Sequence, residues 1–590
     1  MVRRLPIDDP SILDLDPVSD DDVIPAFLGG ADSARRLRAV ILAAYMARAM
    51  PITDGQTVSP LSLGTQDPTD ATTLLQDAAD AAYEQNRALL IPRTGTTWKG
   101  AGLDIRVPVY LQGDMALTAG QAQTTPLMTL TGVEAFYGQG GKLSGAAVSG
   151  TVSNLHGLIK VVQSPRLQFQ GLNIGRTYYG AVIIDEESPD VVFLGGKMKD
   201  IHKHCIVDRS GGARAIGVDF YGVGFGDGHV IRYGSFATDT NWMVPHRGGL
   251  VLGCKFRYCS GNGVLCETDS ERILIALNDY AVGPNFVKAD KASRVSDVTM
   301  IGNVEADLNN GGVWDPDTQT WSAGATTLSA AALSVAGMQY IGNKQYNCGR
   351  RCDFGADAVV EGNYWESCGD GTELVRFVSD EGVGGVFSRN AGTDLLGYIN
   401  LANTSNVTVD GNRRMTFASG KTAMRIGGDG HKVRRNNFIS AGGTAKGLDI
   451  ISTTTNLDAT DNDVSTFSTP ISYGVAATVT SNSILDNGST SNSPIPTVVI
   501  AAGVGTVGRV RKLRIDTEAS AATDDLDTLT MTDPPIGWTV RIESAVNSRD
   551  TTLKNGTGNL ALASDCTLAT TSNWIVLLWT GSVWKELARG

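Results

Sequence analysis

The sequence predicts an all-β protein in which short parallel strands form stacked coils, that is, a parallel β-helix. The first observation is periodic: apolar strands end in an Asn that recurs at intervals of 20, 27, 22, 24, 26 and 20 residues, at Asn343, Asn363, Asn390, Asn412, Asn436, Asn462 and Asn482. A period in the twenties, with turn residues between apolar strands, is typical of a solenoid. The second observation is compositional: 590 residues with 69 Gly and only 19% charged residues suit many tight turns around an apolar interior.

The charge balance restricts the partners. A formal net charge of −13 argues against non-specific nucleic-acid binding and gives no reason for attraction to anionic lipid. Residues 1–17 carry Pro and four Asp where a secretory signal needs an apolar core, and the apolar run 39–50 is short and contains Arg48. We therefore expect a neutral or weakly charged partner, no nucleic acid and no membrane insertion.

Residues 15–46 are the first recognisable segment. They contain an acidic stretch, a Val-Ile-Pro step, a Gly-Gly turn and an amphipathic helical pattern. This order resembles the head of many tail-fibre proteins. The resemblance implies that residues 1–65 form a virion-attachment segment that binds phage tail or baseplate proteins.

Residues 66–110 predict a capping helix and the start of the β-helix. Asp70 and Thr72 are N-cap candidates, and an apolar helical stripe follows at Leu74, Leu75, Ala78, Ala82 and Tyr83. The strand "ALLIP" comes next, ended by Pro92. A helix at this place would cover the open end of the stacked strands. The segment resembles the start of the pectate-lyase-like right-handed parallel β-helix, so the resemblance implies that handedness and a single-stranded helix.

Residues 111–490 are expected to form the β-helix itself, with receptor binding and catalysis on its surface. The Asn303 to Asn343 interval spans 40 residues, about 17 more than a normal coil. The excess contains Trp314, Trp321 and Asp315. Extra residues in a solenoid emerge as loops on one face, commonly the binding face.

The carboxylates after two neighbouring corners are the first candidate catalytic groups. Equivalent residues of adjacent coils lie about 4.8 Å apart. Asp353 and Glu373 each follow a corner Asn by ten residues, so without a relative insertion their carboxylates are predicted to lie within about 5 Å of each other. Such a pair raises one pKa, which lets a carboxyl group act as a general acid.

Two further acidic residues belong to the same candidate set. Arg350 and Asp370 each follow their corner by seven residues and are predicted to form a cross-coil ion pair. Glu366 and Asp370, with Glu373, supply a wider carboxylate spacing. Retaining glycosidases use about 5–5.5 Å and inverting ones about 6.5–9.5 Å, so both remain open. The candidate catalytic residues are thus Glu366, Glu373, Asp370 and Asp353.

Aromatic and acidic side chains near these groups are candidate sugar contacts. Flat rings cover the apolar face of a sugar, and polar edges satisfy its hydroxyls. The candidates are Trp365, Tyr364, Trp314, Trp321, Glu267 and Asp269. The alternative is that strand alternation buries one of Tyr364 and Trp365, and that the acidic group around Glu267 is a solvated turn.

The eight Cys residues do not predict a metal site. They lack the paired spacing of zinc ligands, and Cys348 and Cys368 each follow a corner by five residues, as in a buried ladder of free thiols. His202 and His204 lie on one strand face without a recognisable third ligand. We expect no metal and no cofactor.

Residues 491–515 read as a linker, and residues 516–590 predict a small antiparallel β-sandwich because strands alternate with turns such as Asn555-Gly556. The ending "WIVLLWTGSVWKEL" is similar to the C-terminal β domains of phage tail fibres and tailspikes. The resemblance implies a homotrimer, with this domain serving trimerisation or carbohydrate binding.

Taken in order, the three resemblances point to the bacteriophage tailspike family. They imply a virion tail protein, made in the host cytoplasm, that binds bacterial capsule or lipopolysaccharide O-antigen at the cell surface. They also imply an endo-glycosidase that cleaves this polysaccharide with paired carboxylates. Two alternatives stay open: a non-catalytic receptor-binding fibre, and a lyase acting on a uronate-containing polymer.

Overall fold

The computed structural model divides into two compact units, an N-terminal unit that ends at Cys348 and a C-terminal unit that begins at Gly349. The residues that the structure describes are 56–118, 125–145, 157–177, 180–185, 187–224, 228–234, 246–266, 270–289, 295–308, 313–315, 318, 320–322, 331–333, 336–349, 351–378, 383–451, 454–473, 483–485, 495, 497–507, 510–531, 534 and 536–590. The expected virion-attachment segment, residues 1–65, lies almost wholly outside them.

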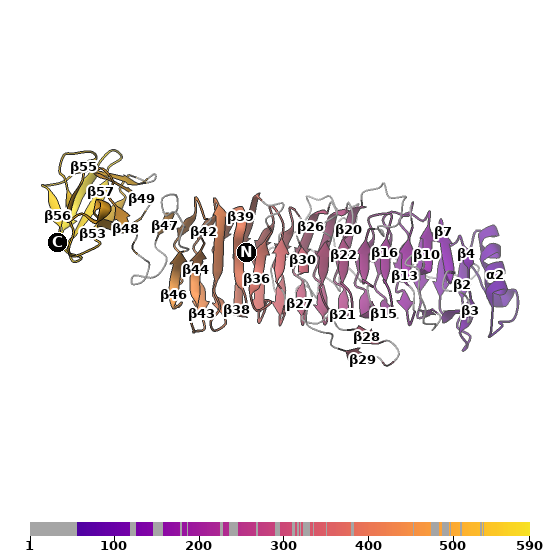
Figure 1. Cartoon of the computed structure of the whole chain (residues 1–590). Coiled ribbons are helices and arrows are strands. Elements are labelled where there is room, and N and C mark those ends of the chain that lie inside the picture. The colour runs from indigo at the N-terminus through magenta and orange to yellow at the C-terminus, as the bar shows by residue number, and fades with distance from the viewer. Residues whose placement is uncertain are drawn as a thin grey trace, which may run out of the picture. The chain divides into compact units, whose positions relative to one another are not determined.

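The N-terminal unit begins with the predicted capping helix, α2 (Thr72–Glu84), which contacts the first strands of the stack (Figure 1). The N-cap is Ala71, which makes no side-chain cap hydrogen bond, so the predicted N-cap candidates Asp70 and Thr72 are each wrong by one residue. The Asp70 carboxylate, just before the cap, accepts the Thr72 backbone N–H at 2.9 Å. Leu75, Ala78, Ala79 and Ala82 form its buried face. Tyr83, which the stripe included, is 56% exposed because it lies at the edge of that face. A 3₁₀ turn (Pro60–Ser62) precedes the helix.

Three parallel ladders follow in the N-terminal unit, and each coil contributes one strand to a ladder (Figure 1). Sheet A contains β1 (Thr57–Val58), β2 (Ala88–Ile91), β5 (Val109–Leu111), β8 (Ala135–Gly138), β11 (Gln168–Gln170), β14 (Val192–Leu194), β17 (Arg214–Ile216), β20 (His246–Leu252), β23 (Ser270–Ala276), β26 (Ser296–Ile301) and β31 (Gln339–Ile341). Sheet B contains β3 (Trp98–Gly100), β6 (Met115–Leu117), β9 (Leu143–Ser144), β12 (Asn173–Ile174), β15 (Lys197–Ile201), β18 (Asp219–Val223), β21 (Lys255–Cys259), β24 (Asp279–Ala281), β27 (Val304–Ala306) and β32 (Lys344–Tyr346). Sheet C contains β4 (Leu103–Ile105), β7 (Met128–Thr131), β10 (Gly157–Val162), β13 (Gly180–Ile184), β16 (Ile206–Asp208), β19 (Ile231–Tyr233), β22 (Val264–Cys266) and β25 (Val287–Ala289). A further short strand is β30 (Ala331–Leu333).

The interior of this unit is filled by side chains stacked from coil to coil. Phe169 is tilted against Phe136 at 5.6 Å between ring centroids and stacked on Phe193 at 4.8 Å. Phe220 and Phe256 stack in the same way on sheet B at 5.0 Å. Because strand side chains alternate between the two faces, every second residue enters this core and the others face outward.

The extra residues between Asn303 and Asn343 include an antiparallel hairpin, as the interval indicated. Strands β28 (Val313–Asp315) and β29 (Thr320–Ser322) pair with Trp314 opposite Trp321. Strand β28 contacts β18 and β21 of sheet B. The insertion is therefore folded against the outer face of that sheet.

Among the described residues, the C-terminal unit continues the same construction with six strands in each of two ladders and four in the third. One ladder contains β33 (Cys352–Phe354), β36 (Glu373–Phe377), β39 (Tyr398–Asp410), β41 (Met424–Asp429), β44 (Lys446–Ile450) and β46 (Thr469–Tyr473). A second contains β34 (Val359–Glu361), β37 (Val383–Ser388), the end of β39, β42 (Lys432–Arg434), β45 (Asp458–Thr460) and β47 (Ser483–Leu485). The third contains β35 (Tyr364–Glu366), β38 (Ala391–Leu395), β40 (Met415–Phe417) and β43 (Phe438–Ser440).

The recurring Asn residues are buried rungs in both units, which confirms the periodicity. In a typical rung, Asn412 accepts the Asn390 backbone N–H at 2.9 Å, and its amide donates to the Phe387 carbonyl at 3.1 Å and to Asn436 at 2.7 Å. The described rungs are Asn278, Asn303 and Asn343 in one unit and Asn363, Asn390, Asn412, Asn436 and Asn462 in the other. Cys254 occupies the same register, since its N–H donates to Asn278. Asn482 lies outside the described residues.

Residues 497–590 form a separate C-terminal β body with its own core. Its main sheet has the order β48 (Thr497–Val499), β50 (Lys512–Asp516), β53 (Thr539–Ser544), β57 (Trp574–Trp579), β58 (Trp584–Arg589) and β55 (Leu560–Ala561). Smaller sheets contain β49 (Val504–Val507) with β52 (Thr528–Met531), and β51 (Thr523–Leu526) with β54 (Asp550–Leu553) and β56 (Cys566–Leu568). A 3₁₀ turn lies at Glu518–Ser520.

The predicted antiparallel pairing is present in β53, β57 and β58, whereas β48, β50 and β53 pair in parallel. The stretch 491–515, expected as a linker, contributes β48, β49 and most of β50, because its alternating apolar residues Val498, Val507 and Leu513 enter the core. All eight Cys thiols are buried and free. No helix in the described part of the chain has the length and apolar character of a membrane span.

Candidate functional site

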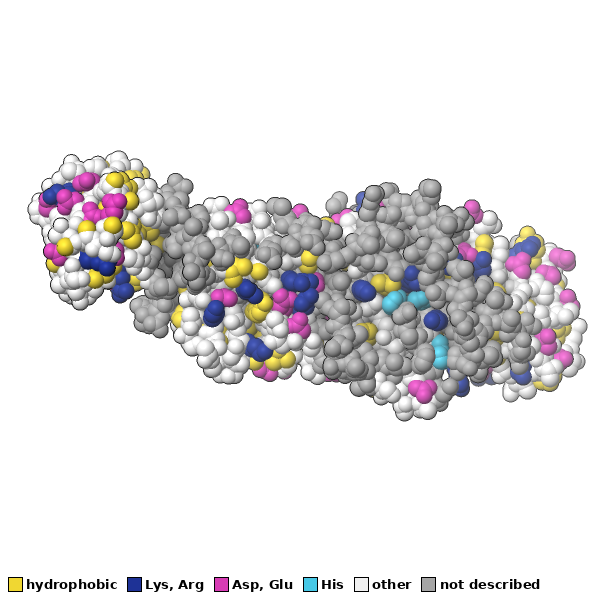
Figure 2. All heavy atoms as spheres, in the orientation of Figure 1, with side chains coloured by type: hydrophobic (Ala, Val, Ile, Leu, Met, Phe, Trp, Pro, Cys, Tyr) yellow, Lys and Arg dark blue, Asp and Glu magenta, His cyan; other side chains and the backbone are white. Residues whose placement is uncertain are grey.

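The candidate site is a polar row on the outward face of the C-terminal unit. Strand pairing sets Asp353 beside Arg376, Arg376 beside Asn400, Asn400 beside Arg425 and Arg425 beside Asp449. Neighbouring members are separated by one strand spacing of about 4.8 Å. In Figure 2, basic and acidic side chains gather on the face around β36. The row thus presents hydrogen-bonding groups at regular steps along the coils.

The register corrects one prediction. Asp353 lies opposite Arg376, so the expected direct pairing of Asp353 with Glu373 does not form. Arg376 follows its corner Asn363 by 13 residues, whereas Asp353 follows Asn343 by ten. The turn between β35 and β36 is therefore three residues longer, and the count from the corner fails there.

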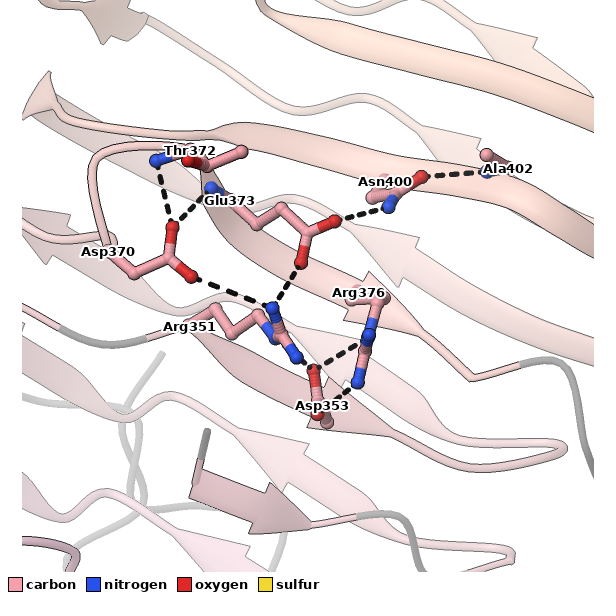
Figure 3. Close-up of polar contacts among 8 residues, drawn as sticks. All are labelled: Arg351, Asp353, Asp370, Thr372, Glu373, Arg376, Asn400 and Ala402. Atoms are coloured by element: carbon pink, nitrogen blue, oxygen red, sulfur yellow. Dashed lines mark hydrogen bonds and ion pairs between the residues drawn. The ribbon is translucent and has the colours of Figure 1, made fainter. Parts of the chain in front are cut away.

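Asp353 is a buried carboxylate held by two guanidinium groups (Figure 3). Arg376 donates to it twice, through Nε at 3.1 Å and Nη2 at 2.7 Å, and Arg351 Nε donates at 3.0 Å. Burial lowers the pKa of Arg376, but the hydrogen bonds to Asp353 and its charge outweigh burial, so the pKa is raised. Asp353 therefore orients both arginines and has little room left for a substrate.

Glu373 lies at the start of β36, with its side chain only 10% exposed. Its Oε1 accepts a short hydrogen bond from the Asn400 amide, and Asn400 is oriented by accepting the Ala402 N–H at 2.8 Å. Its Oε2 lies 2.8 Å from Arg351 Nη1 as an ion pair. That contact lacks hydrogen-bond alignment, so among the described residues Oε2 is a buried oxygen without a hydrogen bond.

Asp370 approaches the same arginine from the turn before β36 (Figure 3). Its Oδ1 accepts the backbone N–H groups of Thr372 at 2.8 Å and Glu373 at 2.6 Å, and its Oδ2 lies 3.7 Å from Arg351 Nη1. Because Glu373 Oε2 lies 2.8 Å from that same nitrogen, the two carboxylate oxygens are no farther apart than the sum of these distances. This upper limit admits the roughly 5–5.5 Å separation of retaining glycosidases.

The predicted ion pair of Arg350 with Asp370 stays a prediction, because Arg350 lies outside the described residues. Among the described residues, Arg351 is an arginine that reaches Asp370. Arg351, Arg376 and Asn400 were missed as site residues by sequence reasoning. The signal that would have found them is the alternation on β33, β36 and β39, which predicts one outward polar residue on each strand once the register is known.

Glu366 lies on β35, in a different ladder from Glu373. Its exposed carboxylate accepts the Tyr364 hydroxyl at 3.2 Å, and that hydroxyl is 2.8 Å from the Thr393 hydroxyl. Trp365 is fully buried and stacks on Phe387 at 5.7 Å. Of the two aromatic candidates, alternation thus buries Trp365, which cannot contact a sugar, and leaves Tyr364 half-buried at the surface.

The remaining candidates belong to the N-terminal unit. Trp314 and Trp321 lie opposite each other on the hairpin β28–β29. Trp314 is 4% exposed and Trp321 is half-buried. Glu267 and Asp269 lie outside the described residues. The described residues contain no group of three or more His, Cys, Asp or Glu side chains arranged to hold a metal ion.

Comparisons with known proteins find similar structures but no sequence relative. No protein-family model and no curated protein matches the chain. The tailspike of E. coli bacteriophage HK620 in complex with a pentasaccharide matches at TM-score 0.31 and 10% identity, covering 72% of this chain and 79% of that one. The Dettilon tailspike protein matches at TM-score 0.30 and 14% identity, covering 72% of this chain and 70% of that one.

A third match is the catalytic unit of a GH87 α-1,3-glucanase from Streptomyces thermodiastaticus, at TM-score 0.30 and 13% identity. It covers 68% of this chain and 66% of the enzyme. Phage tailspikes make up most of the similar structures. At these identities and TM-scores the matches carry no inference about activity, which has to come from the residues of this chain.

Proposed function

We propose that this chain is a tailspike that binds a bacterial surface polysaccharide, capsule or O-antigen, and cleaves its glycosidic bonds at Glu373 and Asp370. The observation that carries the proposal is the convergence of these two carboxylates on Arg351 Nη1, at 2.8 and 3.7 Å. Among the described residues, Glu373 Oε2 is a buried oxygen with no hydrogen bond, and it is paired with Arg351, so a substrate has to displace that contact to reach it. Neither the convergence of the two carboxylates nor the buried Oε2 takes part in the strand pairing that forms the β-helix.

In the proposed mechanism, the Glu373 carboxylate supplies the electron pair, either to the anomeric carbon directly or by taking a proton from a water molecule. Asp370, whose side chain is 31% exposed, donates a proton to the glycosidic oxygen as the bond to the anomeric carbon breaks. Its Oδ1 is occupied by two backbone N–H groups, so Oδ2 is the oxygen that would face the glycosidic oxygen. Arg351 orients both carboxylates, and Asn400 fixes Glu373.

The rest of the polar row supplies sugar contacts in this proposal. Arg425 and Asp449 face outward on consecutive strands next to the buried Asn400, so successive sugar units meet a hydrogen-bonding group at each of these two coils. Such groups pair with hydroxyls whose orientation differs between sugars. Asp353 acts as a positioning residue through Arg351 and Arg376.

Incubation of the purified protein with polysaccharides from candidate hosts tests the proposal. We expect polymer size, measured by size-exclusion chromatography, to fall with the wild type and not with Glu373→Gln, which keeps the shape of the side chain. Glu366→Gln is the matched variant, since Glu366 lies in another ladder and should keep cleavage. Loss of cleavage in Glu366→Gln together with wild-type rates in Glu373→Gln would refute the assignment.

The same incubation separates hydrolysis from elimination. A lyase acting on a uronate polymer creates a carbon–carbon double bond, so its products absorb in the ultraviolet, whereas a hydrolase creates a new reducing end without that absorbance. The anomeric form of the first product, read by NMR, then distinguishes retention from inversion.

A non-catalytic receptor-binding spike is the second candidate, and one observation favours it. Asp353 is fully occupied by two arginines, and Glu373 is ion-paired, so the cluster resembles a structural network as well as a reactive one. Binding of a host polysaccharide without any fall in its size would support this second candidate for that polymer.

Assembly completes the proposal. We propose that the protein is a homotrimer attached to the virion through residues 1–65, with residues 66–110 capping the β-helix, 111–490 binding receptor, and the C-terminal part serving trimerisation or sugar binding. Size-exclusion chromatography with light scattering should give three times the 62.2 kDa chain mass. A mass of one chain would contradict the trimer.

A further inference from the structure

Four aromatic rings gather on the outer face of sheet B in the N-terminal unit. We call them, with two lysines, the aromatic platform: Tyr221, Tyr258, Trp314, Trp321, Lys197 and Lys199. Tyr221 and Tyr258 lie 5.2 Å apart between ring centroids, and each lies 5.2 Å from Trp314. Trp321 lies 6.0 Å from Tyr258. Outward aromatic groups of this size are unusual on a solvated sheet and need an explanation.

Gly222, which has no side chain, leaves the space that Trp314 of the aromatic platform occupies. The register of β15, β18 and β21 aligns Asp200, Gly222 and Tyr258, and all three have left-handed backbone, with φ between 56° and 63°. Trp314 fills the space over Gly222, where a Cβ atom would lie 2.2 Å from the indole nitrogen. The indole N–H donates to Asp200 at 3.0 Å, and the Trp314 backbone N–H donates to the Ser260 hydroxyl at 2.9 Å.

Trp314 therefore anchors the hairpin, and the other rings are left as a surface. Trp314 is 4% exposed, whereas Tyr221, Tyr258 and Trp321 are half-buried. Trp314 makes the anchoring contacts, whereas Trp321 packs on Tyr258 at 6.0 Å between ring centroids. The hairpin thus adds an accessible ring to two tyrosines that already face outward.

Positive charge lies beside these rings. The ammonium groups of Lys197 and Lys199 lie 5.9 and 5.5 Å from the centre of the Tyr221 ring. Lys197 is exposed, and Lys199 lies 3.6 Å from Asp200, whose other oxygen is taken by Trp314. Burial raises the pKa of Tyr221, so its hydroxyl stays neutral and able to donate at neutral pH.

We propose that the aromatic platform is a binding site for an acidic saccharide, distinct from the carboxylate site of the C-terminal unit. The sugar ring stacks through its C–H face on Trp321 and Tyr258, and its carboxylate pairs with Lys197 and Lys199. A neutral sugar would use the rings but make no ion pair with the two ammonium groups. The net charge of −13 disfavours a nucleic acid as the occupant.

The aromatic platform is independent of the proposed cleavage, because it binds the saccharide without breaking a bond. A non-catalytic spike could carry the same site. Its ligand chemistry is that of a uronate-type polymer, with Lys197 and Lys199 as the cationic groups and Asp200 and Asp219 as their acidic neighbours. Since binding and cleavage are measured separately, failure of one leaves the other testable.

Isothermal titration of the full-length Glu373→Gln protein tests the proposal with oligogalacturonate, oligomannuronate and oligosialate as acidic probes and malto-oligosaccharide as the neutral probe. We expect at least one acidic probe to bind and the neutral probe to bind about ten-fold more weakly or not at all. Trp321→Ala, and Lys197→Gln combined with Lys199→Gln, should each weaken acidic binding about ten-fold. Lys432→Gln, an exposed lysine of the other unit, should leave it unchanged.

Two glycine variants check the architecture. Gly222→Ala should abolish binding, because its Cβ displaces Trp314 and unseats the hairpin. Gly362→Ala is the matched control, since Gly362 has a similar φ of 64° and open space where the Cβ would lie. Binding of none of the acidic probes, equal affinity for acidic and neutral probes, or wild-type affinity in the Trp321 and lysine variants would each overturn the proposal.

Discussion

Arg351 shows how one side chain can organise several acids. It contacts Asp353, Asp370 and Glu373 at once, from a position that is about one-quarter exposed. Two of those carboxylates are almost wholly buried, and a buried charge that loses its partner is costly. The arginine therefore contributes to stability as well as to the geometry of the candidate site.

We predict that Arg351→Met lowers the free energy of unfolding by about 2–3 kcal/mol, somewhat less than for a fully buried pair because the guanidinium is partly solvated. Chemical denaturation followed by circular dichroism measures the change. The matched control is Arg389→Met, which removes an ion pair to Glu361 whose arginine side chain is 74% exposed, and should cost under about 1 kcal/mol. Equal losses in the two variants would contradict the assignment.

Glu305 is a second residue whose surroundings decide its behaviour. It is buried in the interior of the N-terminal unit, where its two oxygens accept the Tyr340 hydroxyl at 3.0 Å and the Gln345 amide at 2.9 Å. Burial raises its pKa from 4.5 to about 7, although the two hydrogen bonds lower it. The folded protein therefore holds this proton more tightly than the unfolded chain does.

The sign of the pH effect follows from that difference. Between about pH 4.5 and pH 7 the folded state keeps a proton that the unfolded state has lost, so stability falls as pH rises and levels off above pH 7. At 1.36 kcal/mol per pH unit the total is about 3 kcal/mol. Glu305→Gln should remove this slope in denaturation curves recorded across that range. An unchanged slope in the variant would show that other groups cause it.

At the scale of the element, the buried Asn rungs join one coil to the next. Asn412 alone takes part in hydrogen bonds with Asn390, Phe387 and Asn436. Each amide both accepts from the preceding coil and donates to the following one. The corner is thus held by side-chain hydrogen bonds in addition to backbone ones, such as that from the Asn437 N–H to the Asn412 carbonyl at 2.9 Å.

Asn412→Ala should lower the free energy of unfolding by about 3 kcal/mol, because it leaves several buried backbone and amide groups without partners at about 1–3 kcal/mol each. Thermal and denaturant unfolding measure the loss. Asn437→Ala is the control from the adjacent position, where the amide is partly exposed and bonds only to Asp463 among the described contacts, and the loss should be within about 1 kcal/mol. A loss as large at Asn437 would argue against a special role for the rungs.

The elements also show why the fold was predictable from sequence and the site only in part. The Asn spacing predicted the hydrogen-bonded rungs because every coil must turn at an equivalent corner. The apolar stripe predicted α2 because one face of that helix must pack against the stacked strands. The carboxylate pairing failed because the turn after β35 is three residues longer, a length that nothing in the local sequence marks. Trp365 was ambiguous because alternation alone does not say which of two adjacent aromatic residues faces inward.

At the scale of the molecule, the C-terminal β body has the properties of an independent domain. Its core contains Val498, Leu513, Val540, Ile575 and Trp584, all from residues 497–590. The Trp584 indole N–H donates to the Leu529 carbonyl at 3.0 Å within the same body. A hydrophobic core enclosed by one segment is what autonomous folding requires.

We therefore predict that residues 495–590 expressed alone are soluble and unfold cooperatively, as followed by circular dichroism and near-ultraviolet signals from its tryptophans. The matching truncation, residues 1–494, should keep the β-helix signal. A fragment that shows no cooperative transition would mean that this core depends on the rest of the chain.

The Asn rungs have a consequence for how such a chain changes over time. Asn303 and Asn343 are bonded as neighbours, with an amide-to-amide distance of 2.8 Å, although 40 residues separate them. Each rung responds only to its neighbours in space, and the entropy of closing a longer loop rises slowly with length. New segments can therefore be inserted between two Asn rungs without breaking the hydrogen bonds that join the rungs. The ligand specificity of the surface can thus change while the β-helix stays intact.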